Sequence, residues 1–227
     1  MKSYGQYCAL AKALDVVGGR WTLLIVRELL IRGRLRYTDL REGLPGIATN
    51  LLVDRLRELE KFGIVESAIV GPPISANLFW LTERGAALEP ILMQLGAWGA
   101  PLLAEASSKD KFHTHWIALP AKLHLVDLTP SEPSVCIQLE HAGEPLSIRI
   151  KGTIQPQVGP AADADLTLKG RPRLLLGTLL KRIDWNAAIA AGLKYEGDPA
   201  VLSRIGRAGS ANGRSSVRGI SPASNAN

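Results

Sequence analysis

Four arginines lie close together in the N-terminal half of the chain, with one acidic residue among them. They are Arg32, Arg34, Arg36 and Arg41, and the acidic residue is Asp39. Guanidinium groups at this density suit contacts with phosphate oxygens, which hold a protein on a nucleic acid without reading its sequence. A solvated charged face is the alternative. The helical pattern around the arginines favours phosphate contact.

A second polar group lies on a helix predicted from Thr49 to Lys61, where apolar residues at helical spacing should face inward. On its outer side Asn50 could pair with an adenine edge, and Arg55 or Arg57 with guanine or phosphate. Asp54 would need a cytosine amine or an arginine. With the upstream arginines and the tip of a following hairpin, the candidate contact residues are Arg34, Arg36, Arg41, Thr49, Asn50, Val53, Asp54, Arg55, Arg57, Pro72, Pro73 and Ser75. The tip offers no cation, so we expect it to contribute shape and backbone contacts.

The elements around these residues follow a recognisable order. Helical spacing and breakers predict helices over 10–17, 21–31, 37–44, 49–61 and 86–104, and strands over 64–70 and 76–81. Two helices joined by a tight turn allow the second to enter a major groove, while the hairpin reaches the neighbouring backbone or minor groove. This order predicts a winged helix-turn-helix.

The same stretch resembles a known family. Residues 8–99 resemble the HxlR family of bacterial transcriptional regulators, which are relatives of the MarR group. The resemblance rests on Cys8, Ala13–Leu29, Tyr37–Leu40, Leu44–Ile47, Leu52–Glu60, Gly63–Val65, Leu81–Gly85 and Trp98–Gly99. Two positions depart from the family pattern: Ala9 stands where proline is usual, and Tyr37 where phenylalanine is common. The resemblance implies a dimeric regulator that binds double-stranded DNA.

The apolar stripe of the predicted helix 86–104, which includes Trp98, has two interpretations. It could be core against the first helix, or one half of a dimer seam, because a winged helix on a palindromic operator needs two copies. The resemblance favours a homodimer made by the N-terminal helix together with this one.

The two cysteines cannot form a disulfide framework or a four-ligand zinc site by themselves. Cys8 on an apolar N-terminal helix is either a small buried hydrophobe or a redox sensor. In several members of the resembling family, the cysteine at this place senses oxidants or electrophiles. Lys12, one turn along, could lower its pKa. Cys136 lies in an alternating apolar run and is predicted to be core.

Length, composition and charge predict two domains of an α+β protein. The chain has 227 residues with 46% hydrophobic and 21% charged residues, which excludes general disorder. We expect a winged-helix domain over 1–106, a linker over 107–111, an α+β domain over 112–205 and a disordered tail over 206–227. The net charges of 1–106, 107–205 and 206–227 are +1, +2 and +3, so half of the total of +6 lies on the tail. The N-terminus lacks a signal-peptide core, and no apolar run is long enough to span a membrane, so we expect a cytoplasmic protein.

In the second domain, period-two runs predict a hairpin over 134–140 and 146–150 and strands over 165–170 and 193–198. Helices are predicted over 173–182, 184–192 and 199–205. Residues 163–205 resemble the C-terminal half of the sterol carrier protein type 2 fold, which implies an apolar tunnel for a lipid-like ligand. The expected pocket residues are Leu175, Leu179, Ile183 and Ile189. An ordinary filled core is the alternative.

No catalytic constellation is evident in the sequence. His113 and His115 would share one side of a strand, but no carboxylate is spaced to complete a site, so no metal is expected. His124 and His141 are scattered, and neither a phosphate-binding loop nor a nucleophile elbow occurs. We therefore expect no cofactor and no enzyme.

The first interpretation is a dimeric DNA-binding regulator controlled by an apolar small-molecule effector. The alternative is a lipid carrier whose winged helix is a protein-interaction platform.

Overall fold

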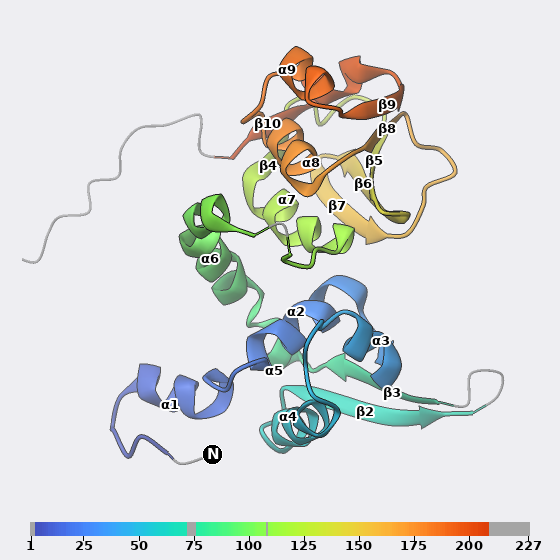
Figure 1. Ribbon diagram of the computed structural model, residues 1–227. Coiled ribbons are helices and arrows are strands. Elements are labelled where there is room, and N and C mark those ends of the chain that lie inside the picture. The colour runs from blue at the N-terminus through green and yellow to red at the C-terminus, as the bar shows by residue number, and fades with distance from the viewer. Residues whose placement is uncertain (1–2, 72–75, 108, 209–227) are drawn as a thin grey trace, which may run out of the picture.

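A computed structural model describes residues 3–71, 76–107 and 109–208. Two units stack on each other, the N-terminal one in blue to green and the C-terminal one in green to red (Figure 1). Each has its own buried apolar core. Among the described residues, no helix is long and apolar enough to cross a membrane.

The N-terminal unit is the expected winged helix, supplemented by a short third strand. Its elements are α1 (Ala9–Val17), α2 (Thr22–Arg32), β1 (Leu35–Arg36), α3 (Tyr37–Glu42), α4 (Thr49–Lys61), β2 (Val65–Val70), β3 (Ala76–Leu81), α5 (Glu83–Ala86), α6 (Glu89–Gly99) and a 3₁₀ helix, η1 (Ala100–Glu105). The sheet has the order β1-β3-β2 with antiparallel pairs. Leu52, Leu56 and Leu59 of α4 are buried in the core, as their spacing predicts.

The prediction of one long helix over 86–104 is wrong, because the chain forms three shorter helices, α5, α6 and η1, in this region. Thr82 begins α5 by accepting a hydrogen bond from the Gly85 amide on its hydroxyl oxygen. Pro90 lies in the first turn of α6, and Pro101 in the first turn of η1. Proline has no backbone N–H for an ongoing helix and favours a new first turn, so the segment restarts at each proline.

The C-terminal unit is a mixed sheet with helices. Its elements are η2 (Thr114–Ile117), α7 (Ala118–His124), β4 (Leu125–Asp127), β5 (Val135–His141), β6 (Glu144–Lys151), β7 (Thr153–Val158), β8 (Leu166–Lys169), α8 (Pro172–Leu179), α9 (Trp185–Ala190), β9 (Lys194–Gly197), η3 (Pro199–Arg204) and β10 (Ile205–Arg207). The five-stranded sheet has the order β7-β6-β5-β8-β9, in which only β5 and β8 pair in parallel. The predicted hairpin of β5 and β6 is confirmed.

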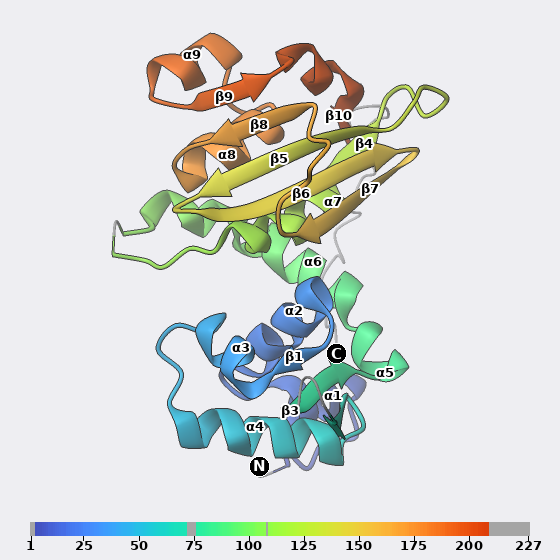
Figure 2. The same ribbon diagram turned by 90° about the vertical axis from the view of Figure 1, so that its right-hand side faces the viewer.

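One face of this sheet packs against helices. Ile137, Leu139 and Ile148 are fully buried in one cluster with residues of α7 and α8, and Figure 2 shows both helices behind the sheet. The other face carries polar side chains. On that face the segment before β8 is held by two hydrogen bonds from Arg149 to Asp163, of 2.8 and 3.0 Å.

The sequence analysis missed several elements of this unit. β10 pairs with β4 and includes Gly206 and Arg207, which were assigned to the tail; the tail prediction over 209–227 lies outside the described residues. β7 contains Pro156, which is tolerated because β7 is an edge strand. The predicted strand carrying His113 and His115 is wrong: His115 lies in η2, which begins after His113. The resemblance to the sterol carrier fold stays a prediction.

Candidate nucleic-acid interface

The outward face of α4 carries most of the predicted base contacts. Thr49, Asn50, Asp54 and Arg57 are exposed, and the last three lie opposite the buried leucines of the same helix. Asp54 and Arg57 form an exposed ion pair of 4.0 Å, so the carboxylate has the arginine partner that it needed. This face is therefore polar and contains both donors and acceptors for base edges.

The N-terminus of α4 is open. Ala48 at the N-cap gives no side-chain hydrogen bond, and the first turn contains no acidic residue, so its amides are free to donate to an anion. The Tyr37 hydroxyl of α3 donates to the Thr49 carbonyl at 3.0 Å. This bond fixes the start of α4 relative to α3.

Three of the four clustered arginines reach the surface. Arg34, Arg36 and Arg41 are exposed, and the Arg34 guanidinium lies 4.5 Å from the centre of the Trp80 ring of β3. Arg32 instead turns inward. Its Nη1 donates to the Asp39 carbonyl at 2.9 Å and lies 3.7 Å from the Glu28 carboxylate. Arg32 is thus part of the internal structure rather than of the basic surface.

Two other positions of α4 differ from the outward pattern. Arg55 is half-buried and bonded to Glu58, and Val53 is partly buried beside Tyr37 and Phe79. Arg55 lies on the same face of α4 as Leu51 and Glu58. Asn50 lies on a different face. The wing-tip candidates Pro72, Pro73 and Ser75 lie outside the described residues.

A separate surface of the N-terminal unit is apolar. On α1, Leu10 is 68% exposed, and on α6 Trp98 is 76% exposed. Other large apolar side chains exposed on these elements or next to them are Tyr7, Leu14, Ile91, Leu95, Leu102 and Leu103. We call these eight residues the α1/α6 surface. Large exposed apolar patches commonly mark surfaces that contact a partner.

Comparison with known proteins identifies the N-terminal unit. The family described as HxlR-like helix-turn-helix matches residues 16–107. The HTH-type transcriptional regulator YvaP of Bacillus subtilis is 36% identical over 87 residues, which are 38% of this chain and 80% of that protein. The chain belongs to the HxlR family.

Other relatives carry the same description. The regulator sll1512 of Synechocystis is 33% identical over 104 residues, covering 45% of this chain and 76% of that protein. A solved structure of YodB from Bacillus subtilis in its reduced form is 29% identical and covers 45% of this chain and 100% of that one, with a TM-score of 0.39. The family match and the named relatives YvaP and sll1512 make this HxlR-family protein a transcriptional regulator. The family match ends at residue 107 and does not include the C-terminal sheet.

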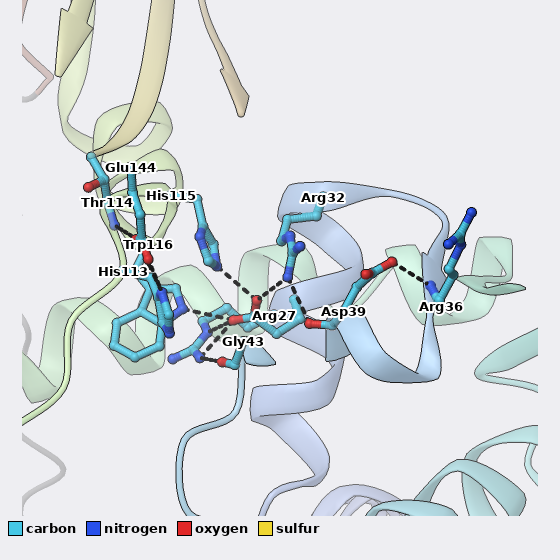
Figure 3. Close-up of polar contacts among 11 residues, drawn as sticks. Arg27, Arg32, Arg36, Asp39, Gly43, His113, Thr114, His115, Trp116 and Glu144 are labelled. Atoms are coloured by element: carbon cyan, nitrogen blue, oxygen red, sulfur yellow. Dashed lines mark hydrogen bonds and ion pairs between the residues drawn. The ribbon is translucent and has the colours of Figure 1, made fainter. Parts of the chain in front are cut away.

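In this HxlR-family chain, α2 makes a buried contact with the C-terminal unit. The Glu28 carboxylate is fully buried, and its oxygens accept hydrogen bonds from His115 Nε2 and Trp116 Nε1, both at 2.8 Å (Figure 3). Arg27 donates to the same carboxylate at 2.8 and 3.0 Å, and its guanidinium lies 4.1 Å from the centre of the Trp116 ring. We call Arg27, Glu28, His115 and Trp116 the interdomain cluster.

These donors keep Glu28 charged. Burial by itself raises the pKa of Glu28, but the hydrogen bonds from His115 and Trp116 and the charge of Arg27 outweigh it, so the pKa lies below its ordinary value. Burial in turn lowers the pKa of Arg27. Sequence reasoning missed this cluster, because Glu28 lies at a core-facing position of α2 and its partners are far along the chain.

A carboxylate lies beside the two histidines, although the sequence spacing did not predict one there. Glu144, the first residue of β6, accepts a hydrogen bond on Oε2 from the Thr114 amide at 3.2 Å, and its Oε1 lies 2.9 Å from His113 Nδ1 (Figure 3). The rings of His113 and His115 stack with centres 5.3 Å apart. The hairpin turn between β5 and β6 brings Glu144 there.

The predicted apolar-ligand residues lie in the core of the C-terminal unit. Leu175 and Leu179 are fully buried, and Ile183 and Ile189 pack against the same cluster. In the described part of the chain, two shallow surface pockets are lined by other residues. The larger, of about 320 Å³, is lined by residues that include Glu140, Lys169 and Arg171. The apolar effector stays a prediction.

The cysteines differ in exposure. Cys136 is buried, as predicted, and burial raises the pKa of its thiol. Cys8 is exposed at the N-cap of α1, so it is not the small buried hydrophobe that the sequence allowed. Lys12 forms an ion pair with Asp15 at 3.7 Å. The sensor role of Cys8 stays a prediction.

Proposed function

We propose that this regulator binds palindromic double-stranded DNA as a homodimer, with the outward face of α4 in the major groove. The exposure of Asn50, Asp54 and Arg57 on one side of α4, opposite the buried leucines, carries this proposal. A helix whose polar face is unoccupied and whose N-terminus is open can approach base edges and phosphates together.

The flanking arginines support the same placement. Arg34, Arg36 and Arg41 lie on the segment before and within α3, which braces α4 through the bond between Tyr37 and Thr49. In helix-turn-helix proteins the first helix crosses the DNA backbone while the second enters the groove. The three cations would therefore lie close to phosphates and fix the register of α4.

The α1/α6 surface supports a second copy as the partner. The exposed leucines and tryptophan of α1 and α6 would gain from being covered, because burial stabilises by about 25 cal/mol per Å² of apolar area. A twofold dimer covers the same patch on both copies and presents two α4 helices to two half-sites. We assign the dimer interface to this surface.

To test this proposal, labelled DNA from upstream of the gene that encodes this protein is titrated with the full chain. Binding is measured by fluorescence anisotropy at salt concentrations between about 50 and 200 mM. The logarithm of the binding constant should fall linearly with the logarithm of salt concentration. Arg36→Ala and Arg41→Ala should each weaken binding and lower the slope by about one. Arg173→Ala, which removes an exposed arginine from α8 of the other unit, is the matched control and should change neither. Salt-independent binding, or equal loss in the control, would refute the proposed interface.

A further inference from the structure

We propose that His113, His115 and Glu144 form a binding site for a divalent transition-metal ion of the zinc type, placed at the contact between the two units. Each residue can offer one ligand atom, and the three atoms lie within 4.8 Å of one another. Two imidazoles and a carboxylate are a ligand set that zinc-binding proteins use, with a fourth position left for water.

The backbone and local hydrogen bonds hold the three residues together. His113 and His115 flank Thr114 at the start of η2, and the Thr114 amide donates to Glu144. His113 Nδ1 faces both carboxylate oxygens of Glu144, at 2.9 and 3.1 Å. A metal ion would take the place of the hydrogen that these two side chains share.

The second nitrogen of His115 already has the partner that metal-binding histidines require. Its Nε2 donates to Glu28, which leaves Nδ1 as the nitrogen for the ion. A histidine ligand almost always donates its other N–H to a carboxylate or carbonyl, which fixes the ring and raises its basicity. Glu28 is itself held by Trp116 and Arg27. The site thus has a rigid ligand in His115.

The other two ligands can move to complete the site. Tetrahedral zinc at its usual bond lengths needs ligand atoms about 3.3 Å apart. The side chains of His113 and Glu144 are 21% and 45% exposed, whereas that of His115 is 9% exposed. The more exposed side chains of His113 and Glu144 therefore have room to shift toward a common ion. Nitrogen ligands select a transition metal over calcium or magnesium, which prefer oxygen.

The site is linked to the DNA-reading elements through Glu28. Arg27 donates to the Gly43 carbonyl after α3 at 3.4 Å, and Arg32 beside Glu28 donates to the Asp39 carbonyl within α3 at 2.9 Å (Figure 3). Fixing His115 by an ion would favour one position of Glu28 and of α3, and α3 braces α4. The proposal that the ion acts as an effector rests on the proposed DNA-binding function. The proposal that these residues bind a metal ion does not depend on that function.

The test of the metal site uses the untagged full chain without DNA. Zn²⁺ is titrated by calorimetry, and Co²⁺ is added in parallel because its visible absorption reports the number and type of ligands. The wild type should bind one ion per chain. His113→Gln and Glu144→Gln should weaken binding at least about tenfold, by loss of a ligand. His124→Gln, which changes a partly buried histidine of α7, is the matched control and should bind as the wild type does. Absence of stoichiometric binding, or equal binding by His113→Gln, would overturn the site.

A second measurement tests the effector role. Operator affinity is measured with and without Zn²⁺ for the wild type and for His113→Gln. A shift of about 5- to 150-fold in the wild type, absent in the variant, is the expected result. One bound ion with unchanged operator affinity would overturn the effector role and leave the metal site standing. If the protein binds no DNA in either condition, the proposed function fails while the calorimetric result stands.

Discussion

The Nε2 atom of His115 lies 2.8 Å from Oε2 of Glu28, although 87 positions separate the two residues along the chain. Both side chains are buried, and they come from different units. Burying a carboxylate is costly unless every lone pair finds a donor, and here the donors come from both sides. The two units are therefore joined by a specific polar contact.

Removing the buried carboxylate should destabilise the whole chain. Glu28→Ala leaves Arg27, His115 and Trp116 without their common acceptor, and breaking a buried ion pair on one side costs about 3–5 kcal/mol. Urea unfolding followed by tryptophan fluorescence measures this loss. Glu66→Ala, at an exposed position of β2, should leave the midpoint nearly unchanged. Equal midpoints for Glu28→Ala and the wild type would contradict the assigned role of the contact.

Base contact should depend on Asn50 more than on Arg55. Asn50 is exposed on the outward face, whereas Arg55 is half-buried and bonded to Glu58. Asn50→Ala should weaken operator binding by about 1–3 kcal/mol, the usual cost of a lost base-edge contact. Arg55→Ala should have a smaller effect. Mobility-shift titration at fixed salt compares them, and circular dichroism confirms that both variants fold. A larger loss for Arg55→Ala would place a different face of α4 in the groove.

Dimerisation should depend on the α1/α6 surface. Trp98→Asp and Leu95→Asp place a charge in the proposed interface, which should give a folded monomer by light scattering. Both positions are exposed in the single chain, so the variants should still fold. Ile69→Asp changes an apolar residue of β2 that is 86% exposed and is the control, which should stay dimeric. A persistent dimer for Trp98→Asp would move the interface to another surface.

The C-terminal unit should lose stability in acid through Asp127. Burial raises the pKa of Asp127, but hydrogen bonds from Arg204 and from the amides of Gly152 and Thr129 outweigh it, so the folded pKa lies below the ordinary value of 3.8. A carboxyl with a lowered folded pKa stabilises the protein above its unfolded pKa, and this stabilisation is lost as pH falls through the folded pKa. Unfolding midpoints measured from pH 6 down to about pH 2 should therefore decline below about pH 4.

Asp127→Asn tests the origin of that decline. The variant should be less stable at neutral pH and should show a smaller decline in acid, because the group that titrates has been removed. Glu132 also lies near Arg204, at 3.5 Å, but its side chain is 57% exposed. Glu132→Gln should therefore behave almost as the wild type. An acid decline of the same size in Asp127→Asn would assign the effect to other carboxyl groups.

The winged helix could be predicted because its signals are local. The leucines of α4 repeat at helical spacing, and the bounds Thr49–Lys61 agree with the sequence prediction. Helix 86–104 was predicted too long because its apolar spacing continues through Pro90 and Pro101, where the backbone has to restart. Periodicity reports which face is apolar, but not whether the hydrogen-bond ladder is continuous.

The interdomain cluster could not be predicted, because its pairing depends on how two units dock. Glu28 lies among the buried residues of α2, and His115 was expected on a strand. Glu144 is 31 positions from His113, and only the fold of β5 and β6 brings the two together. A lone carboxylate on a core-facing helix position was the one available signal, because such a group needs partners.

The position of α2 has a mechanical consequence. Its Ile25, Val26 and Leu29 belong to the N-terminal core, while Ile31 packs against the C-terminal core. A single helix that is shared by two cores transmits a displacement of one core to the other. A protease that cuts the connection between Glu105 and His113 should therefore nick the chain without releasing either half, and the nicked protein should elute at the size of the intact one.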